Sequence, residues 1–221
     1  MREGPHFLVR REIRMLSSGN LPQQFHTVKD ADENFIWVGE PMFFPFLCTG
    51  IPFLIIGLLW GAIDYFGFIQ HMGSQKGFPV GFAVPFFTLH LFPFWGSILN
   101  MLRLILVHKN TFYAITNKRV MMRSGFWGLD FNAVDYDKIS DIQVTVNPLE
   151  NILGVGTIRI SAGKVSSKGS PLTDDFIAVK NPYEVFKKLK TVMVDIKTDW
   201  NYPNKLRPEE NPGYNTKYEP K

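Results

Sequence analysis

Two long apolar runs dominate the pattern of hydrophobic and polar residues along this chain. They cover residues 42–69 and 78–107, and polar segments flank both of them. A run of about 20 apolar residues is long enough to cross a bilayer as an α-helix. Inside lipid, a helix satisfies its own backbone without a partner. The pattern therefore predicts a transmembrane helical hairpin over residues 42–107, with spans at about 43–66 and 80–106.

Lys and Arg are concentrated at the ends of the two spans that are remote from the connecting loop. The loop, residues 70–77, contains one cation, Lys76. Basic residues stay on the cytoplasmic side of a membrane. The sequence therefore predicts a multi-pass plasma-membrane protein with both termini in the cytoplasm. The cations on that side are Arg2, Arg10, Arg11, Arg14, Lys29, Arg103, His108 and Lys109.

Three ionisable residues, Asp64, His90 and Arg103, fall inside or near the spans. Such residues in a membrane are often functional. Asp64 is expected near the outer end of the first span, and Arg103 near the inner end of the second, where its side chain reaches the phosphates. His90 is the one expected at mid-depth. A proton or ion pathway through these three residues is an alternative function, that of a small transport or ion-handling subunit.

The first span contains Gly57 and Gly61, a small-xxx-small pattern that lets another helix approach closely. It fits a seam between two copies of the chain. It also fits packing against the second span of the same chain, which is the interpretation we favour. Several prolines in the two runs imply kinks or a break: Pro45, Pro52, Pro79, Pro85 and Pro93.

From residue 108 onward the apolar residues alternate with polar ones, which predicts β-strands. Asn117 marks a tight turn between the first two strands, because Asn tolerates a left-handed backbone. After the strands, Asn181 and Pro182 begin an amphipathic helix. These elements predict a small open β-barrel over residues 108–197, closed by a C-terminal helix. The expected strands cover residues 111–116, 119–123, 141–146, 155–162 and 175–179.

Two segments lie outside the hairpin and the barrel. Residues 1–41 are expected to form an N-terminal cytoplasmic segment. Residues 198–221 form a tail rich in Pro, Asn and Tyr, without the period of a helix or a strand. This tail is expected to be extended or disordered, or to dock on a folded surface.

Several short motifs follow one another over roughly residues 33–197. They are Trp37-Val-Gly-Glu-Pro41, Tyr113-x-Ile-Thr-Asn-Lys-Arg-Val120, Gly125, Tyr136-x-Lys-Ile-x-Asp-Ile-x-Val144 and Leu153-Gly-x-Gly-Thr-Ile158. Their order and spacing resemble the bacterial pleckstrin-homology-like (PH-like) membrane proteins.

The resemblance implies one or two transmembrane hairpins that precede a PH-like domain, in the inner membrane of a bacterium. It also implies that Lys118, Arg119 and Arg123 contact phosphorylated head groups. The alternative is that Lys118 and Arg119 are ordinary turn residues that keep the strand edge soluble.

Composition narrows the chemistry further. The net charge of +4 on 221 residues, beside a membrane, favours contact with anionic lipid. Nucleic acid is not an expected partner, because no aromatic platform accompanies the basic residues. The one cysteine, Cys48, excludes an intrachain disulfide and a cysteine-based zinc site, and the five histidines are scattered.

The chain contains no catalytic motif for hydrolysis, phosphate transfer or thiol chemistry. We therefore expect no enzyme activity, no cofactor and no metal. The sequence predicts a non-enzymatic membrane protein that presents a cytoplasmic PH-like domain to a protein partner, a second copy of the chain or anionic lipid.

Overall fold

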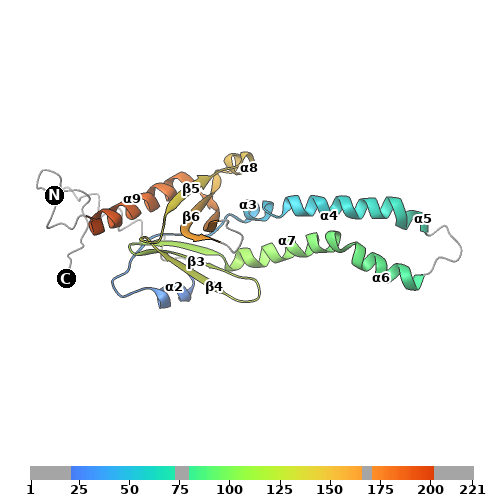
Figure 1. The fold of residues 1–221 in the computed structure, drawn as a ribbon, viewed down its shortest axis with the longest axis horizontal. Helices are drawn as coiled ribbons and strands as arrows, with labels where there is room; N and C mark the ends of the chain where they lie inside the picture. Colours follow the sequence, from blue (N-terminus) through green and yellow to red (C-terminus); the bar gives the residue numbers. More distant parts are fainter. Residues whose placement is uncertain (1–20, 73–79, 166–170, 202–221) are drawn as a thin grey trace, which may run out of the picture. The chain divides into compact units, whose positions relative to one another are not determined.

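The computed structural model of the chain describes residues 21–72, 80–165 and 171–201. The chain divides into two compact units (Figure 1). One combines Met1–Met42 with Thr111–Lys221 and is called the β-domain below; the other, Phe43–Asn110, is called the hairpin. The predictions for Lys76, for the cations of residues 1–20 and for the tail from residue 202 lie outside the described residues.

The β-domain contains two antiparallel sheets. The first has the strand order β1-β2-β3-β4 and the second the order β5-β6-β7. β4 was not predicted, because its sequence, DFNAVD, is too polar to show a clear alternation. The strand bounds are Phe35–Gly39 (β1), Phe112–Thr116 (β2), Arg119–Ser124 (β3), Asp130–Asp135 (β4), Asp141–Thr145 (β5), Val155–Val165 (β6) and Pro171–Lys180 (β7).

One apolar core lies between the two sheets. Alternate side chains of each strand point into it. Tyr113 and Ile115 of the first sheet belong to the same core as Ile158 and Phe176 of the second. The rings of Tyr113 and Phe176 stack with their centroids 4.5 Å apart. The Tyr113 hydroxyl accepts the backbone N–H of Ile177 at 3.0 Å, so the two sheets are also joined by a hydrogen bond.

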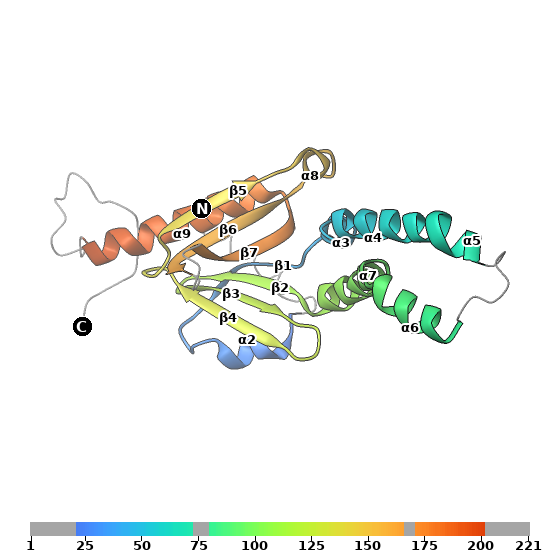
Figure 2. The same ribbon diagram turned by 45° about the vertical axis from the view of Figure 1, so that its right-hand side comes forward.

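Helix α9 (Pro182–Asn201) closes this core, and Figure 2 shows it alongside β5 and β6. Val185, Leu189 and Met193 are buried on the predicted stripe. The lysines Lys187, Lys188 and Lys190 are exposed. The predicted mostly-β domain with a closing C-terminal helix is therefore confirmed. Residues 198–201 were assigned to the tail but are helical, because the backbone hydrogen bonds continue past the buried stripe.

The segment before the hairpin differs from the prediction of a separate N-terminal segment. It forms α2 (Gln23–Val28) and β1, and β1 pairs with β2, with Gly39 opposite Tyr113. Phe25 of α2 is fully buried on the outer face of the first sheet, in a cluster with Ala114 and Met121. In Figures 1 and 2, α2 lies across that face. The hairpin therefore does not precede the domain but is inserted between two of its paired strands.

A short helix that the sequence did not predict connects two strands of the second sheet. α8 (Pro148–Ile152) lies between β5 and β6. Its first turn has a capping box: the Asn147 side chain accepts the N–H of Glu150, and the Glu150 side chain accepts the N–H of Asn147. This pair satisfies two backbone groups that would otherwise lack partners.

In the hairpin, Ile51–Phe68 is the one stretch of described residues that is long and apolar enough to cross a membrane by itself. The second run passes that test only as two helices, Gly81–His90 and Phe92–Asn110, bent by 50° at a break. Two spans with kinks or a break at their prolines were predicted; the break is present in the second run, but a second span is not confirmed. Pro93 accounts for the break, because it has no N–H to donate to the carbonyl four residues earlier. The helix bounds are Phe43–Cys48 (α3), Ile51–Asp64 (α4), Gln70–Met72 (α5), Val80–His90 (α6) and Phe92–Asn110 (α7), with a π-helical turn at Tyr65–Ile69.

Gly57 and Gly61 face α7 of the same chain. A Cβ atom at Gly57 would overlap the hydroxyl of Ser97, and one at Gly61 would lie 2.8 Å from the ring of Phe94. The two arms approach this closely because neither glycine has a side chain. The small-xxx-small pattern therefore packs α4 against α7 of the same chain.

Candidate functional site

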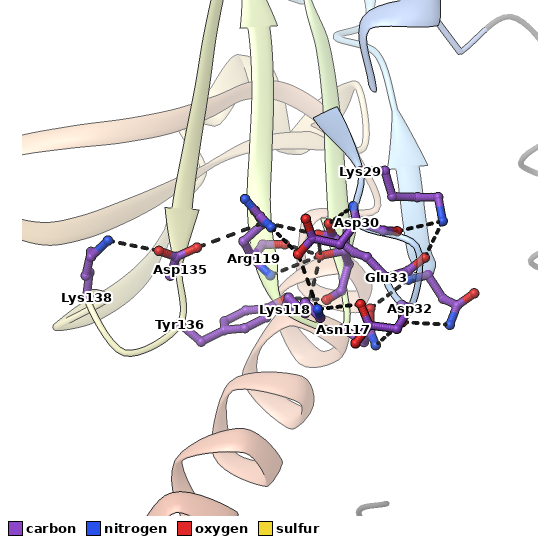
Figure 3. Close-up of polar contacts among 12 residues, drawn as sticks. Lys29, Asp30, Asp32, Glu33, Asn117, Lys118, Arg119, Asp135, Tyr136 and Lys138 are labelled. Atoms are coloured by element: carbon purple, nitrogen blue, oxygen red, sulfur yellow. Dashed lines mark hydrogen bonds and ion pairs between the residues drawn. The ribbon is translucent and has the colours of Figure 1, made fainter. Parts of the chain in front are cut away.

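The turn between β2 and β3 carries Lys118 and Arg119, two of the predicted binding residues. Acidic residues from the segment between α2 and β1 hold both of them (Figure 3). Lys118 Nζ lies 2.6 Å from Asp32 Oδ1 and 3.2 Å from Asp30 Oδ2. The Arg119 guanidinium lies 2.8 Å from Asp30 Oδ2 and 3.3 Å from Glu33 Oε1. The positive charge of the turn is therefore balanced by acidic side chains of the same chain. We call these five residues the turn cluster.

Glu33 is the buried centre of the turn cluster and has no exposed surface. Its carboxylate accepts hydrogen bonds from the Thr116 hydroxyl at 2.6 Å and from the Asp30 backbone N–H at 3.0 Å. The Thr116 oxygen in turn accepts the backbone N–H groups of Lys118 at 3.1 Å and Arg119 at 3.0 Å. A buried charge is stable when it is paired and hydrogen-bonded in this way. The turn is thus folded around one carboxylate.

Asn117 occupies the predicted tight turn, but for a different reason from the one proposed. Among the described non-glycine residues, only Ala178 and Asn181 have a positive φ. The Asn117 side chain instead joins the turn to the segment before β1, because its Oδ1 accepts the backbone N–H of Asn34 at 2.7 Å. The backbone N–H of Asn117 donates to the Asn34 carbonyl at 3.1 Å. The asparagine therefore connects two segments that are distant in the sequence.

The charges of the turn cluster shift the pKa values of its exposed members. The hydrogen bond from Lys118 lowers the pKa of Asp32, and the same bond raises the pKa of Lys118. Both groups are consequently charged at neutral pH. Behind the turn, the Tyr136 hydroxyl donates to the Thr116 carbonyl at 2.6 Å. Burial raises the pKa of Tyr136 well above its ordinary value, so this donor keeps its proton.

The turn cluster follows the end of β2 that is remote from the hairpin in the sequence. β2 starts at Phe112, just after the last hairpin residue, Asn110, and ends at Thr116. A strand of five residues spans about 17 Å. Lys118 and Arg119 therefore lie at the opposite end of the first sheet from the residues that enter the hairpin.

Arg123 lies apart from these two residues. It is opposite Phe112 in the register, at the sheet end that leads into the hairpin. Its side chain is largely buried, and its Nη1 donates to Gln24 Oε1 of α2 at 2.8 Å. The guanidinium also lies 5.0 Å from the centre of the Phe112 ring. Arg123 therefore takes part in the packing of α2 on the sheet. The structure does not bring it together with Lys118 and Arg119.

In the hairpin, the structure brings Asp64 and His90 together and leaves Arg103 apart. His90 Nε2 lies 3.3 Å from Asp64 Oδ1, and Asp64 is buried. The two residues were expected at different depths. They are level with each other because the antiparallel register that sets Gly57 against Ser97 continues to this pair. Arg103 is exposed on α7.

Sequence reasoning missed Asp30, Asp32 and Glu33, because no short-range pattern relates them to a turn more than 80 residues later. The usable signal was complementary charge, acidic before β1 and basic at Lys118 and Arg119. In the described part of the chain, no group of three or more His, Cys, Asp or Glu side chains could hold a metal ion. The turn cluster instead presents both acidic and basic side chains.

Two sheets around one core, closed by a C-terminal helix, define a PH-like domain, a class that generally binds lipids or proteins. Here an apolar hairpin is inserted between its first two strands. The family model described as bacterial PH domain matches residues 43–193. The chain belongs to this family.

A crystal structure at 2.00 Å resolution is similar to part of the chain. It is that of a DUF1696 family protein with a pleckstrin-homology domain from Shewanella loihica PV-4. The similarity covers 38% of this chain and 71% of the other, with 14% sequence identity and a TM-score of 0.27. No curated protein matches this chain.

Proposed function

We propose that the chain is a non-enzymatic integral membrane protein of the bacterial inner membrane that holds a PH-like domain at the cytoplasmic surface to bind a protein partner. One observation carries this proposal. The apolar hairpin is inserted between β1 and β2, which pair side by side in one sheet. A bilayer that contains the hairpin therefore holds the domain by two adjacent strands.

The side chains of the hairpin support its place in lipid. Along α4 most of the large apolar residues point outward, and seven of them are at least 40% exposed. Soluble monomers rarely expose a continuous apolar surface of this kind. In a bilayer the same surface faces acyl chains at no cost. These residues include Phe53, Ile55, Ile56, Leu59, Trp60 and Ile63.

The turn cluster favours a protein partner over anionic lipid as the ligand. Lys118 and Arg119 are already paired with acidic side chains, which a lipid phosphate would have to displace. They also follow the far end of β2, about 17 Å along this strand from its first residue, which is twice the screening length of about 8 Å at physiological salt. A protein can meet both signs of charge in the cluster. Because the domain is tethered, a weak site suffices for a partner in the same membrane.

Two measurements test the anchoring. Membranes are washed with sodium carbonate, and spheroplasts with a C-terminal tag on the protein are treated with protease. We expect the protein to stay in the pellet and the tag to be digested only after permeabilisation. Release by carbonate would exclude the anchor, and digestion in intact spheroplasts would exclude the orientation.

A photo-crosslinking amino acid at Asp137 tests the ligand class. Asp137 is exposed in the turn after β4, at the same sheet end as Lys118, since Arg119 is opposite Asp135. We expect a specific protein adduct that is lost when Asp30 and Asp32 are both changed to Lys. Adducts with lipid alone would favour the lipid-binding interpretation.

The pair of Asp64 and His90 favours a second candidate function, transport of protons or ions. Among the described residues, Asp64 Oδ2 is buried and has no hydrogen-bond partner, so the carboxylate has capacity for a further ligand. The double variant Asp64→Asn/His90→Gln tests this in proteoliposomes that contain a pH-sensitive dye. A proton leak that the wild-type chain shows and the variant lacks would support transport. Identical fluorescence traces from the wild-type chain and the variant would contradict transport and leave binding as the proposed function.

A further inference from the structure

We propose that the β-domain rests on the membrane through an apolar rim formed by two loops, whose side chains enter the bilayer interface. The inference rests on the proposed function, since it requires a hairpin in the membrane. We define the apolar rim as the exposed apolar residues of the β3–β4 loop and of α8. They are Phe126, Trp127, Leu129, Leu149 and Ile152.

The exposure of these side chains is the first observation. Trp127 is 94% exposed and Ile152 is 81% exposed. They lie in two different loops, one of each sheet. In water each such side chain leaves apolar surface uncovered, which is unfavourable. Tryptophan is enriched at membrane interfaces, where its ring meets apolar chains and its N–H meets polar groups.

The position of the β3–β4 loop is the second observation. The hairpin ends at Asn110, and Phe112 is opposite Arg123 in the register. Trp127 follows Arg123 by four residues, so at most about 14 Å of chain separates them. The chain itself therefore keeps Trp127 near Phe112, the first residue of β2. In Figures 1 and 2 this loop lies at the end of the β-domain where β2 begins.

The second loop reaches the same end of the domain. The backbone N–H of Met42, the last residue before the hairpin, donates to the Ala178 carbonyl of β7 at 2.9 Å. Two residues on, Lys180 is opposite Val155, the first residue of β6. α8 ends three residues before Val155. Both loops of the apolar rim therefore lie at the end of the β-domain that contains Met42 and Phe112.

The backbone of the β3–β4 loop is built to project its aromatic residues. Gly125 is buried with a φ of +153°, and a Cβ atom there would overlap the carbonyl of Gly128. The chain thus folds back on itself over four residues. Phe126 and Trp127 are displayed at the tip, and their rings contact edge to face, with centroids 5.1 Å apart.

The partner of this rim is the bilayer to which the hairpin belongs. The two loops lie at the end of the β-domain where the chain joins an apolar segment, so an anchored hairpin would bring this end of the domain to the bilayer. With the rim seated in the interface, the turn cluster faces away from the membrane, toward a cytoplasmic partner.

Fluorescent labelling of the full chain in liposomes tests the proposal. In a Cys48→Ser background, three single-cysteine variants carry an environment-sensitive dye: Trp127→Cys in the rim, Asp137→Cys at the far sheet end and Leu59→Cys in the hairpin. The liposomes contain phosphatidylcholine and phosphatidylglycerol, with a doxyl quencher either near the head group or deep in the acyl chain.

We expect the head-group quencher to remove most of the fluorescence at position 127 and to leave position 137 unchanged, while the deep quencher acts at position 59. Quenching at 59 without quenching at 127 would overturn the rim and leave the anchor intact. No quenching at 59 would overturn the anchor itself. Equal quenching at 127 and 137 would also overturn the rim, because the domain would then lie on its side.

Discussion

Glu33 shows how one buried carboxylate stabilises a contact between segments 83 residues apart. It accepts the Thr116 hydroxyl and lies 3.3 Å from Arg119 Nε. We expect Glu33→Ala to lower the free energy of unfolding by about 2–4 kcal/mol, because Arg119 and Thr116 lose their buried partner. Denaturation of the full chain in nanodiscs, followed by circular dichroism, measures the change. Asp137→Ala, at an exposed site in a neighbouring turn, is the control and should change stability by less than about 0.5 kcal/mol. Equal effects of the two substitutions would show that the Glu33 contacts are not specific.

From the burial of Tyr136 we predict how the stability of the β-domain changes at alkaline pH. Burial raises its pKa in the folded state, so its stabilising contribution is complete below pH 10, where an unfolded tyrosine is still protonated, and is lost as the pH rises further. Between pH 9 and pH 11 this one group removes about 1.4 kcal/mol. In Tyr136→Phe that part of the pH slope should disappear. At pH 7 the variant reports only the lost hydrogen bond to Thr116, which serves as the control. An unchanged slope would mean that Tyr136 ionises without unfolding.

At the scale of elements, the predictions succeeded where the signal was local. The stripe of Val185, Leu189 and Met193 and the alternation at Ile142 are patterns within one element, and α9 and β5 followed from them. β1 was missed because it forms only by pairing with β2, which comes after the hairpin. The same holds for the site, since Lys118 and Arg119 were singled out without the acidic residues that pair with them.

The close contact between α4 and α7 leads us to predict that a larger side chain at this contact destabilises the hairpin. We expect Gly57→Val to force the arms apart and to destabilise the hairpin by about 1–3 kcal/mol, since the new side chain overlaps Ser97 and the Pro93 carbonyl. Unfolding in mixed micelles, followed by helical signal, measures this. Gly81→Val is the matched control, because a Cβ atom there has open space. If Gly57→Val instead changed only the molecular mass of the assembly, the glycines would form a seam between copies.

At the scale of the whole molecule, the structure shows how the apolar hairpin and the β-domain are connected in the chain. The predicted order was a segment, then an anchor, then a domain. In the structure, β1 and β2 are neighbours in one sheet, so the hairpin is a long connection within that sheet. Hydrophobicity identified the hairpin because each of its two apolar runs is long and continuous. The insertion was not predictable from local patterns, because strand pairing across an inserted hairpin of 68 residues leaves no periodic signal.

This topology predicts that the β-domain folds without the hairpin. Gly39 is opposite Tyr113, so the two ends left by removing Phe43–Asn110 are close together. A linker of about four Gly and Ser residues between Met42 and Thr111 should therefore close a β-hairpin. We expect this chain to be soluble and monomeric by size-exclusion chromatography, with a cooperative thermal transition by circular dichroism. The control also lacks residues 1–42 and should aggregate, because it leaves β2 as an unpaired edge and uncovers the sheet face under α2. If both chains were equally soluble, β1 and α2 would be dispensable, and the domain would be complete after the hairpin.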